Sequence, residues 1–226
     1  DIAEWAAETF GGAAVHEGYG QTEANVTIGD CTALFEFREG TMGRAAPGHD
    51  VAIVDPQTAE ATVDPGDIGE IAVRYEGNPV CFKEYLNKPE TTAAKVQNGW
   101  LLTEDLGWMD EDGYVAFESR KDDVIISAGY RIGPVEIEET LAGHEAVADS
   151  AVIGVPDDER GEVPKGFVVL AAGHDPSDDL RERLRGHVRD RLAQYEYPRE
   201  IEFVEDLPKT TTGKVRRASL RDREGI

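Results

Sequence analysis

A short charged run, Arg120-Lys121-Asp122-Asp123, separates two stretches of different pattern. Before it, over residues 43–117, short apolar runs alternate with turn signals, such as the hairpin signal at 110–113. After it, strand-like runs alternate with helical periodicity. The 226 residues, 40% of them hydrophobic, suffice for one large or two modest cores. We therefore predict a first domain over residues 1–121 and a second over residues 122–226.

The first stretch is expected to be rich in strands. Residues 2–10 have the pattern of a short helix, residues 13–16 that of a short buried strand, and residues 89–96 that of a second helix. Short strands separated by turns favour a small antiparallel barrel or sandwich. The strands expected are residues 51–54, 68–75 and 114–117.

The second stretch mixes strands with helices, which is typical of a small α+β domain. Pro134 suits the first position of a helix that continues through residue 141. Ser177 suits the cap of another helix. The apolar residues of that helix recur at every fourth position: Leu180, Leu184, Val188 and Leu192. The strands expected are residues 124–126, 147–155, 166–171 and 201–204.

Charge limits the partners of the chain. Asp and Glu number 46 against 23 Lys and Arg, which gives a formal net charge of -23. This acidic excess argues against nonspecific binding to nucleic acid or to anionic membranes. Only 7 of the basic residues are lysine. An acidic, lysine-poor chain favours a protein that works in high salt, where ions screen self-repulsion; an ordinary acidic cytosolic protein is the alternative.

Several absences in the sequence point to the cytoplasm. Cys31 and Cys81 have no metal-binding spacing and are too few for a disulfide framework. No apolar run is long enough to span a membrane, and no signal-peptide pattern opens the chain. The first five residues resemble the middle of an amphipathic helix. We therefore expect a cytoplasmic chain that begins inside a larger protein.

The first motif with chemical content is Tyr19-Gly20-Gln21-Thr22-Glu23. Glycine allows the backbone to approach a ligand closely. Thr22 supplies a hydroxyl, and the carboxylate of Glu23 is a hard oxygen ligand suited to Mg2+. The alternative is a turn in which Thr22 caps a helix.

A second motif, Thr103-Glu104-Asp105, is expected at the end of a strand. The carboxylate of Asp105 can accept two hydrogen bonds from a vicinal diol such as that of ribose. The alternative is that Asp105 caps a turn.

Two further blocks carry basic residues. In residues 119–134, Arg120 and Arg131 flank a strand, and arginine binds phosphate in a bidentate manner; Gly129 allows an unusual backbone angle. The alternative is a hairpin with surface arginines. Near the end of the chain, Lys214 lies on a Thr/Gly turn, from which its ammonium can reach an anionic oxygen. The alternative there is a solvated basic end.

These four blocks, in this order, resemble those of the AMP-forming acyl-CoA synthetases of the adenylate-forming superfamily. Residues 160–163 and 195–199 resemble the medium-chain branch. The Ser/Thr/Gly-rich phosphate loop of that family lies upstream of Tyr19 and has no counterpart here. The resemblance therefore implies a C-terminal fragment, inactive alone: the β-rich, barrel-like end of a large N-terminal domain, followed by a mobile α+β lid. Glu104 departs from the glycine that is usual in the family.

The resemblance also implies roles for individual residues. Lys214 would bridge the substrate carboxylate and the phosphate, Thr22 would contact the α-phosphate, Glu23 would bind Mg2+, and Asp122 would be the hinge of the lid. The residues implied for ATP or AMP are Glu17, Gly18, Tyr19, Gly20, Gln21, Thr22, Asp105, Arg120 and Arg131. The residues implied for coenzyme A are Ser127, Ala128, Gly129, Arg160, Tyr197, Pro198 and Arg199.

The activity implied is a ligase of fatty acid metabolism. A carboxylic acid reacts with Mg-ATP to form an acyl-adenylate, and coenzyme A then takes the acyl group and releases AMP. An adenylation domain that loads a carrier protein is one alternative, and a noncatalytic binding module is another. The expected partners are small molecules, without nucleic acid, and self-association is compatible with the sequence.

Overall fold

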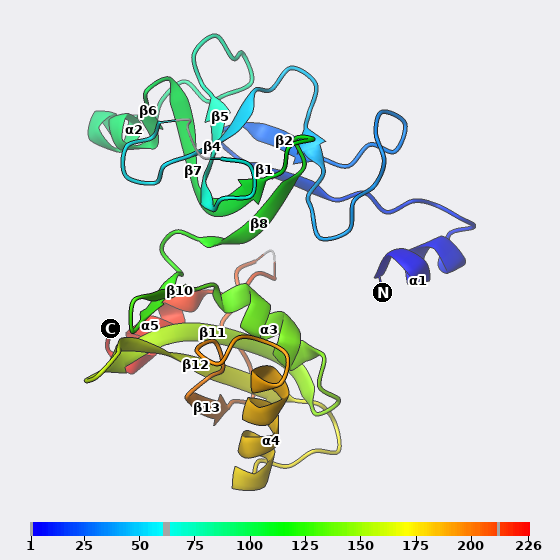
Figure 1. The fold of residues 1–226 in the computed structure, drawn as a ribbon, viewed down its shortest axis with the longest axis vertical. Coiled ribbons are helices and arrows are strands. Elements are labelled where there is room, and N and C mark those ends of the chain that lie inside the picture. The colour runs from blue at the N-terminus through cyan, green and yellow to red at the C-terminus, as the bar shows by residue number, and fades with distance from the viewer. Residues whose placement is uncertain (1, 61–63, 212) are drawn as a thin grey trace. The chain divides into compact units, whose positions relative to one another are not determined.

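The computed structural model describes residues 2–60, 64–211 and 213–226, and the chain forms two compact units, Asp1–Glu118 and Ser119–Ile226 (Figure 1). The division falls within strand β8 (Val115–Arg120). The sequence placed the domain boundary after residue 121. The assignment of a nucleotide-binding role to one unit and a lid role to the other stays a prediction. No helix in the described ranges is long and apolar enough to cross a membrane.

The first unit begins with helix α1 (Ile2–Thr9) and a three-stranded antiparallel sheet. Its strands, in the order β1-β2-β3, are Gly18–Gln21, Asn25–Gly29 and Arg44–Ala45. The strand predicted at residues 13–16 is wrong, because these residues are exposed and lie outside any strand. The hairpin pairs Gly18 with Gly29 and so places the first strand later in the chain. An apolar run does not become a strand without a neighbour to pair with.

A second sheet in this unit is five-stranded and antiparallel, with the order β4-β5-β7-β6 and with β8 paired to β7. Its strands are β4 (Val51–Val54), β5 (Gly69–Arg74), β6 (Val96–Gln97), β7 (Trp100–Met109) and β8; helix α2 (Pro89–Lys95) precedes β6. The predicted strands at 51–54, 68–75 and 114–117 are confirmed. The described strands lie in open sheets, and no closed barrel forms among them.

The second unit is a mixed sheet covered by helices. The strands are β9 (Ile125–Ser127), β10 (Tyr130–Ile132), β11 (Val147–Asp157), β12 (Gly161–Leu170) and β13 (Glu200–Phe203). Their order is β10-β9-β12-β11, and β13 runs parallel to β12. The helices are α3 (Pro134–Ala142), α4 (Asp178–Arg189) and α5 (Arg217–Glu224). The α+β class expected from the sequence is confirmed.

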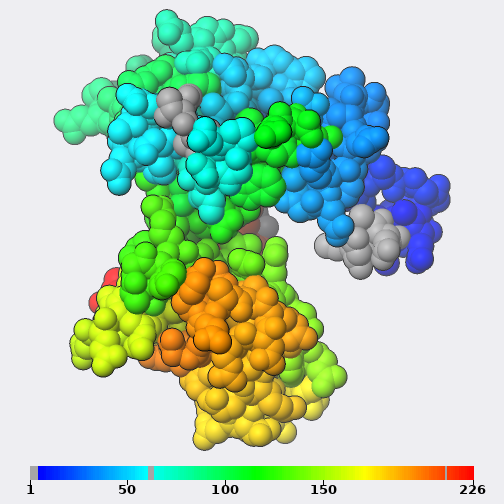
Figure 2. All heavy atoms as spheres, in the orientation of Figure 1, coloured from blue at the N-terminus to red at the C-terminus, as the bar shows by residue number. Residues whose placement is uncertain are grey.

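Alternation along the strands of this unit separates two apolar layers. Val152 and Val168 pack with residues of α3 and α4, whereas Ile153 and Phe167 pack with Leu220 of α5. Successive side chains of a strand point to opposite faces, so α3 and α4 cover one face of the sheet and α5 the other. The segment from α4 to residue 200, coloured yellow to orange, forms one continuous surface of this unit (Figure 2).

The helix starts follow from local chemistry. Pro134 occupies the first turn of α3, where its missing N–H costs no hydrogen bond. The Ser177 hydroxyl accepts a hydrogen bond from the Leu180 N–H at 3.2 Å and caps α4. Leu192 lies beyond the end of α4 and packs partly against the same core. The predicted periodicity is therefore right over the first three apolar positions of this helix.

Candidate functional site

The Tyr19–Glu23 motif forms the end of β1 and the turn of a hairpin. Gln21 pairs with Asn25, so residues 22–24 make the turn. A Cβ atom on Gly20 would lie 1.9 Å from the carbonyl oxygen of Asn25, and only glycine fits there. Strand β2 follows directly, so the alternative in which Thr22 caps a helix is wrong. Thr22 is exposed at the tip of the turn.

The segment 82–85 bonds to both the side chain and the backbone of Glu23. The hydroxyl of Tyr85 donates to Glu23 Oε1 at 2.6 Å, and the N–H of Phe82 donates to the Glu23 carbonyl oxygen at 2.6 Å. Burial, and then the hydrogen bond to Glu23, raise the pKa of Tyr85 to about 12. The phenol therefore keeps its proton near neutral pH and holds the carboxylate of Glu23 in one orientation.

Asp105 lies inside the continuous strand β7, not at a strand end as predicted. The strand continues to Met109 because β5 pairs with it on both sides of an irregularity, from Gly69–Gly107 to Arg74–Trp100. Its alternative role as the cap of a turn is therefore wrong as well. The Asp105 N–H donates to Thr103 Oγ1 at 3.2 Å, and that hydroxyl donates to the Ile71 carbonyl at 2.6 Å.

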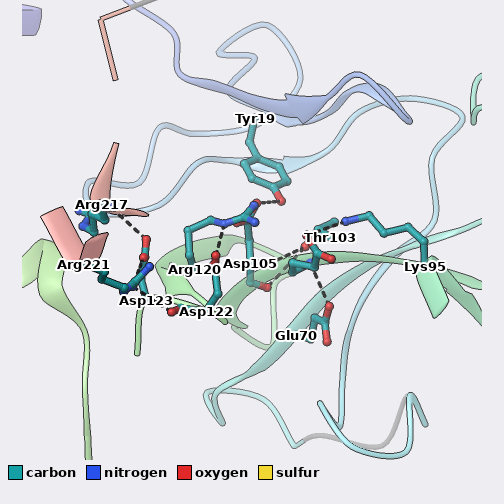
Figure 3. A network of polar contacts seen from close by, with 11 residues as sticks. Tyr19, Glu70, Lys95, Thr103, Asp105, Arg120, Asp122, Asp123, Arg217 and Arg221 are labelled. Carbon is teal, nitrogen blue, oxygen red and sulfur yellow. Dashed lines mark hydrogen bonds and ion pairs between the residues drawn. The ribbon is translucent and has the colours of Figure 1, made fainter. Parts of the chain in front are cut away.

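A short hydrogen bond joins the hairpin to β7. The hydroxyl of Tyr19 donates to Asp105 Oδ2 at 2.6 Å, as Figure 3 shows, although the two residues are 86 positions apart. Asp105 is 8% exposed. Charge-assisted bonds of this length are stronger than neutral ones. The structure thus brings together two of the motifs on which the sequence interpretation depends.

The remaining residues implied for the nucleotide in this unit lie in that hairpin or directly before it. The N–H of Glu17 donates to Asp30 Oδ2 at 3.1 Å, and Gly18 is exposed at the start of β1. Gln21 is half-buried. Within the described part of the chain, the Gln21 Nε2 atom is buried without a hydrogen-bond partner. Buried amides are normally paired, so this atom is suited to a ligand acceptor.

Glu104, where the resembling family usually has glycine, has a left-handed backbone with φ 65°. Its N–H donates to Glu70 Oε1 at 2.9 Å, and its Oε2 lies 3.1 Å from Lys95 Nζ. Lys95 is 8% exposed. The conformation therefore suits glycine, while the side chain neutralises a buried ammonium on α2.

These two opposing effects at Glu104 can be separated. Glu104→Gln removes the carboxylate partner of Lys95 and is expected to lower the free energy of unfolding by ~1–3 kcal/mol. Glu104→Gly removes the same partner but relieves the strain of the left-handed backbone. Its decrease in the free energy of unfolding is therefore expected to be about 1 kcal/mol smaller than that of Glu104→Gln. Urea unfolding of both variants measures this difference, with Glu84→Gln on an exposed residue as control. If Glu104→Gly is less stable than Glu104→Gln, the backbone at this position is not strained by its side chain.

In the second unit, a tight turn between β9 and β10 meets the turn before β12. Ala128 and Gly129 have φ 49° and 87°, and the Ala128 N–H donates to the Arg160 carbonyl oxygen at 2.8 Å. Ser127 pairs with Gly161. The residues implied for coenzyme A at 127–129 and at 160 are therefore neighbours.

The segment around residues 195–199 joins the same surface. The ring of Tyr195 stacks on that of Tyr130, with centroids 4.2 Å apart and planes 11° apart. The Arg199 N–H donates to the Pro164 carbonyl at 2.8 Å, and its guanidinium lies 4.4 Å from the Tyr197 ring centre. Pro198 is buried. Tyr130 and Tyr195 are functional candidates that the sequence interpretation missed, because nothing in their local pattern signals the stack.

The arginines of the third block have different surroundings. Arg131 lies exposed on β10, between Tyr130 and Ile132, which also fits the alternative of a surface arginine. The Nε of Arg120 lies 3.3 Å from Oδ1 of Asp122 in the connection between β8 and β9 (Figure 3). Asp122 itself is exposed, and Asp123 is buried.

Lys214 projects from a closed turn. The Thr210 N–H donates to the Lys214 carbonyl at 2.7 Å, the Lys214 N–H donates to Thr210 Oγ1 at 3.1 Å, and Gly213 has φ 87°. Thr212 lies outside the described residues. The Lys214 side chain is exposed and has no carboxylate within ion-pair distance among the described residues. In contrast, Lys209 pairs with Asp149 at 2.6 Å, and that hydrogen bond raises the Lys209 pKa.

Two family models match the chain. The model described as AMP-binding enzyme matches residues 1–86, and that of the AMP-binding enzyme C-terminal domain matches residues 136–214.

Curated relatives agree with these matches. The mitochondrial acyl-coenzyme A synthetase ACSM4 of Rattus norvegicus is 45% identical over 227 residues, covering 99% of this chain and 38% of its own length. The uncharacterized acyl-CoA ligase YtcI of Bacillus subtilis is 44% identical over 213 residues, covering 94% of this chain and 40% of its own length. The chain thus spans less than half of these relatives.

Solved structures show the same similarity. ATP-bound MatB from Rhodopseudomonas palustris has a TM-score of 0.86 and 35% identity, covering 97% of this chain and 42% of that one. The anthranilate CoA ligase AuaEII in complex with anthranoyl-AMP has a TM-score of 0.85 and 33% identity, covering 99% of this chain and 41% of that one.

Proposed function

Because the chain belongs to the AMP-binding enzyme family, we propose that the protein that carries it is an AMP-forming acyl-CoA synthetase. It joins a carboxylic acid to ATP, releases pyrophosphate, and transfers the acyl group from the adenylate to coenzyme A. The observation that carries this proposal is the bond between Tyr19 and Asp105, which places a buried carboxylate beside the hairpin of the first motif. The names of the relatives, which include acyl-CoA synthetases, support it.

Asp105 is suited to hold the ribose of the nucleotide. Its carboxylate accepts the Tyr19 hydroxyl, and the bonds of Thr103 hold its backbone in place. A buried, oriented carboxylate loses little conformational entropy when it accepts two vicinal hydroxyls. Thr22, at the tip of the adjoining turn, is suited to donate to the α-phosphate, and the backbone of residues 17–21 to line the adenine and acyl site.

Glu23 is suited to hold Mg2+. Its carboxylate supplies a hard oxygen ligand, oriented by Tyr85. The described residues contain no cluster of three or more ligating side chains, which fits an ion that takes one or two carboxylates and completes its shell with water and phosphate oxygens. When bound, Mg2+ would neutralise part of the charge of the triphosphate.

Lys214 is suited to the first half-reaction because its exposed ammonium can approach both the substrate carboxylate and the α-phosphate. Fixed positive charge aimed at a reacting phosphate contributes strongly to catalysis. Arg120 and Arg131 would add charge for the nucleotide. In the second half-reaction the surface made by residues 127–129, 160 and 197–199 would bind coenzyme A. Rotation about Asp122 would present the two surfaces in turn.

High-salt adaptation and a cytoplasmic location form part of the proposal. The net charge of -23 supports adaptation to high salt. Both cysteines are unpaired, which supports a reducing compartment.

The test measures both half-reactions in the protein that carries this chain. A panel of straight-chain and aromatic carboxylic acids is assayed for acid-dependent ATP–pyrophosphate exchange, and then for thioester formation with coenzyme A, each in dilute and molar salt. We expect exchange with at least one acid class, and AMP release with free coenzyme A as acceptor. Exchange without a coenzyme A product would favour carrier-protein loading, and absence of ATP binding would favour a noncatalytic module.

A further inference from the structure

A cluster of four charged side chains in the second unit, here called the hinge clamp, consists of Asp123, Glu138, Arg217 and Arg221. Arg217 bridges the two acids, with Nη1 3.1 Å from Asp123 Oδ2 and Nη2 2.6 Å from Glu138 Oε2. The Nη2 atom of Arg221 lies 2.6 Å from the other oxygen of Asp123. Figure 3 shows Arg217 and Arg221 converging on Asp123.

The clamp is largely buried. Its side chains are 9% (Asp123), 15% (Glu138), 16% (Arg217) and 25% (Arg221) exposed. The backbone adds a further bond, since the Val152 N–H donates to Glu138 Oε1 at 2.6 Å. Removing one member of a buried ionic group leaves an uncompensated charge, which is strongly unfavourable. Separating any one of the four side chains from its partners is therefore strongly unfavourable.

The position of the clamp in the chain connects two functional candidates. Asp123 directly follows Asp122, and the Arg221 Nη2 atom also donates to the Asp122 carbonyl oxygen at 3.0 Å. Arg217 opens α5, just after the turn that carries Lys214. The two ends that the clamp joins, Asp123 and Arg217, are 94 positions apart in the sequence.

On the other side of Asp122, the ion pair between Arg120 and Asp122 is more exposed than the clamp. The Arg120–Asp122 pair is separated by 3.3 Å, and its side chains are 40% and 67% exposed. Exposed pairs of this kind contribute little stability. The segment after Asp122 is thus anchored to α3 and α5 by buried charges, while the ion pair before it is open to water and easily exchanged.

We propose that Arg217 and Arg221 are positioning residues for the adenylation step. They bind the segment after Asp122 and the Lys214 turn into one rigid body, so that rotation at Asp122 carries the Lys214 ammonium to a defined position. The inference rests on the proposed function. Small misplacement of a catalytic group has large effects on rate, roughly 100-fold for about 1 Å, so a loosened clamp should affect the step that uses Lys214.

The first test separates the half-reactions. Arg221→Gln and Arg217→Gln are expected to lower acid-dependent ATP–pyrophosphate exchange by roughly 10- to 100-fold, while thioester formation from preformed acyl-adenylate and coenzyme A changes by less than about 3-fold, because that step does not use Lys214. The matched control is Arg223→Gln on the same helix, whose own side chain is exposed and pairs with the half-buried Glu202. Equal losses in both half-reactions overturn the inference.

The second test does not depend on activity. Hydrogen exchange is followed at the amides of Thr210, Gly213 and Arg216, whose bonds close the lysine turn, and at that of Asp123. Arg221→Gln is expected to speed exchange at both places, and Arg223→Gln at neither. Unchanged exchange in the lysine turn of Arg221→Gln overturns the inference, even if Arg217→Gln fails to fold. If no acid supports exchange of pyrophosphate, the proposed function fails while this measurement still decides the clamp.

Discussion

Replacing Lys214 with alanine is expected to lower acid-dependent ATP–pyrophosphate exchange by about 100- to 1,000-fold, a range typical for the loss of one charge-stabilising donor. The ammonium projects from a closed turn and has no carboxylate partner among the described residues. No fold-stabilising ion pair of the described part is therefore lost with it. The rate of thioester formation from preformed acyl-adenylate and coenzyme A should stay within a few-fold of that of the unmodified protein, because this half-reaction does not use Lys214.

Lys209→Ala is the matched control for this variant. Lys209 lies in the same segment but is paired with Asp149, so its loss should leave pyrophosphate exchange nearly unchanged. Circular dichroism of both variants reports whether the fold is retained. Equal loss of both half-reactions in Lys214→Ala would contradict its assignment to adenylation alone.

Replacing Asp105 with alanine is expected to raise the KM for ATP by on the order of 100-fold, because two charge-assisted hydrogen bonds to ribose hydroxyls are lost at ~1.5–3 kcal/mol each. The bond from Tyr19 to Asp105 is lost from the free and the nucleotide-bound protein alike, so it does not enter this change in KM. The measurement is the ATP dependence of pyrophosphate exchange at saturating acid, together with nucleotide binding by calorimetry.

Asp50→Ala controls for the removal of a carboxylate from the same unit. Asp50 pairs with Arg74 at 3.5 Å, and its side chain is 65% exposed. Its loss should therefore leave the KM for ATP unchanged within about 2-fold, as expected for an exposed pair. An unchanged KM for ATP in Asp105→Ala would show that this carboxylate does not bind the nucleotide.

Elements with strong local signals could be predicted well. Helix α3 begins at the predicted Pro134 and α4 at the cap Ser177, because a proline in the first turn and a capping hydroxyl act within a few residues of the chain. The strands at 51–54 and 68–75 were also predictable, since each is a compact run with turns at its ends. The strand expected at 13–16 failed because pairing depends on a partner that local sequence does not specify.

Some features of the candidate site could likewise be predicted from local sequence, and others could not. The residue types at positions 19–23, 103–105 and 214 indicate their chemistry without a structure, because each side chain has a limited set of interactions. The role of Tyr85 as the donor to Glu23, and that of Tyr195 as the partner of Tyr130, had no local signal. Both depend on which segments the fold brings side by side.

The amino-acid sequence determined the chemical groups, their order along the chain, the α+β class and the family. The tertiary structure decided which groups meet. Tyr19 bonds to Asp105 across 86 positions, and Arg217 to Asp123 across 94. The reason is physical: a side chain's chemistry and a helix cap act over a few residues, whereas contacts between distant segments depend on strand register and on helix packing throughout each unit.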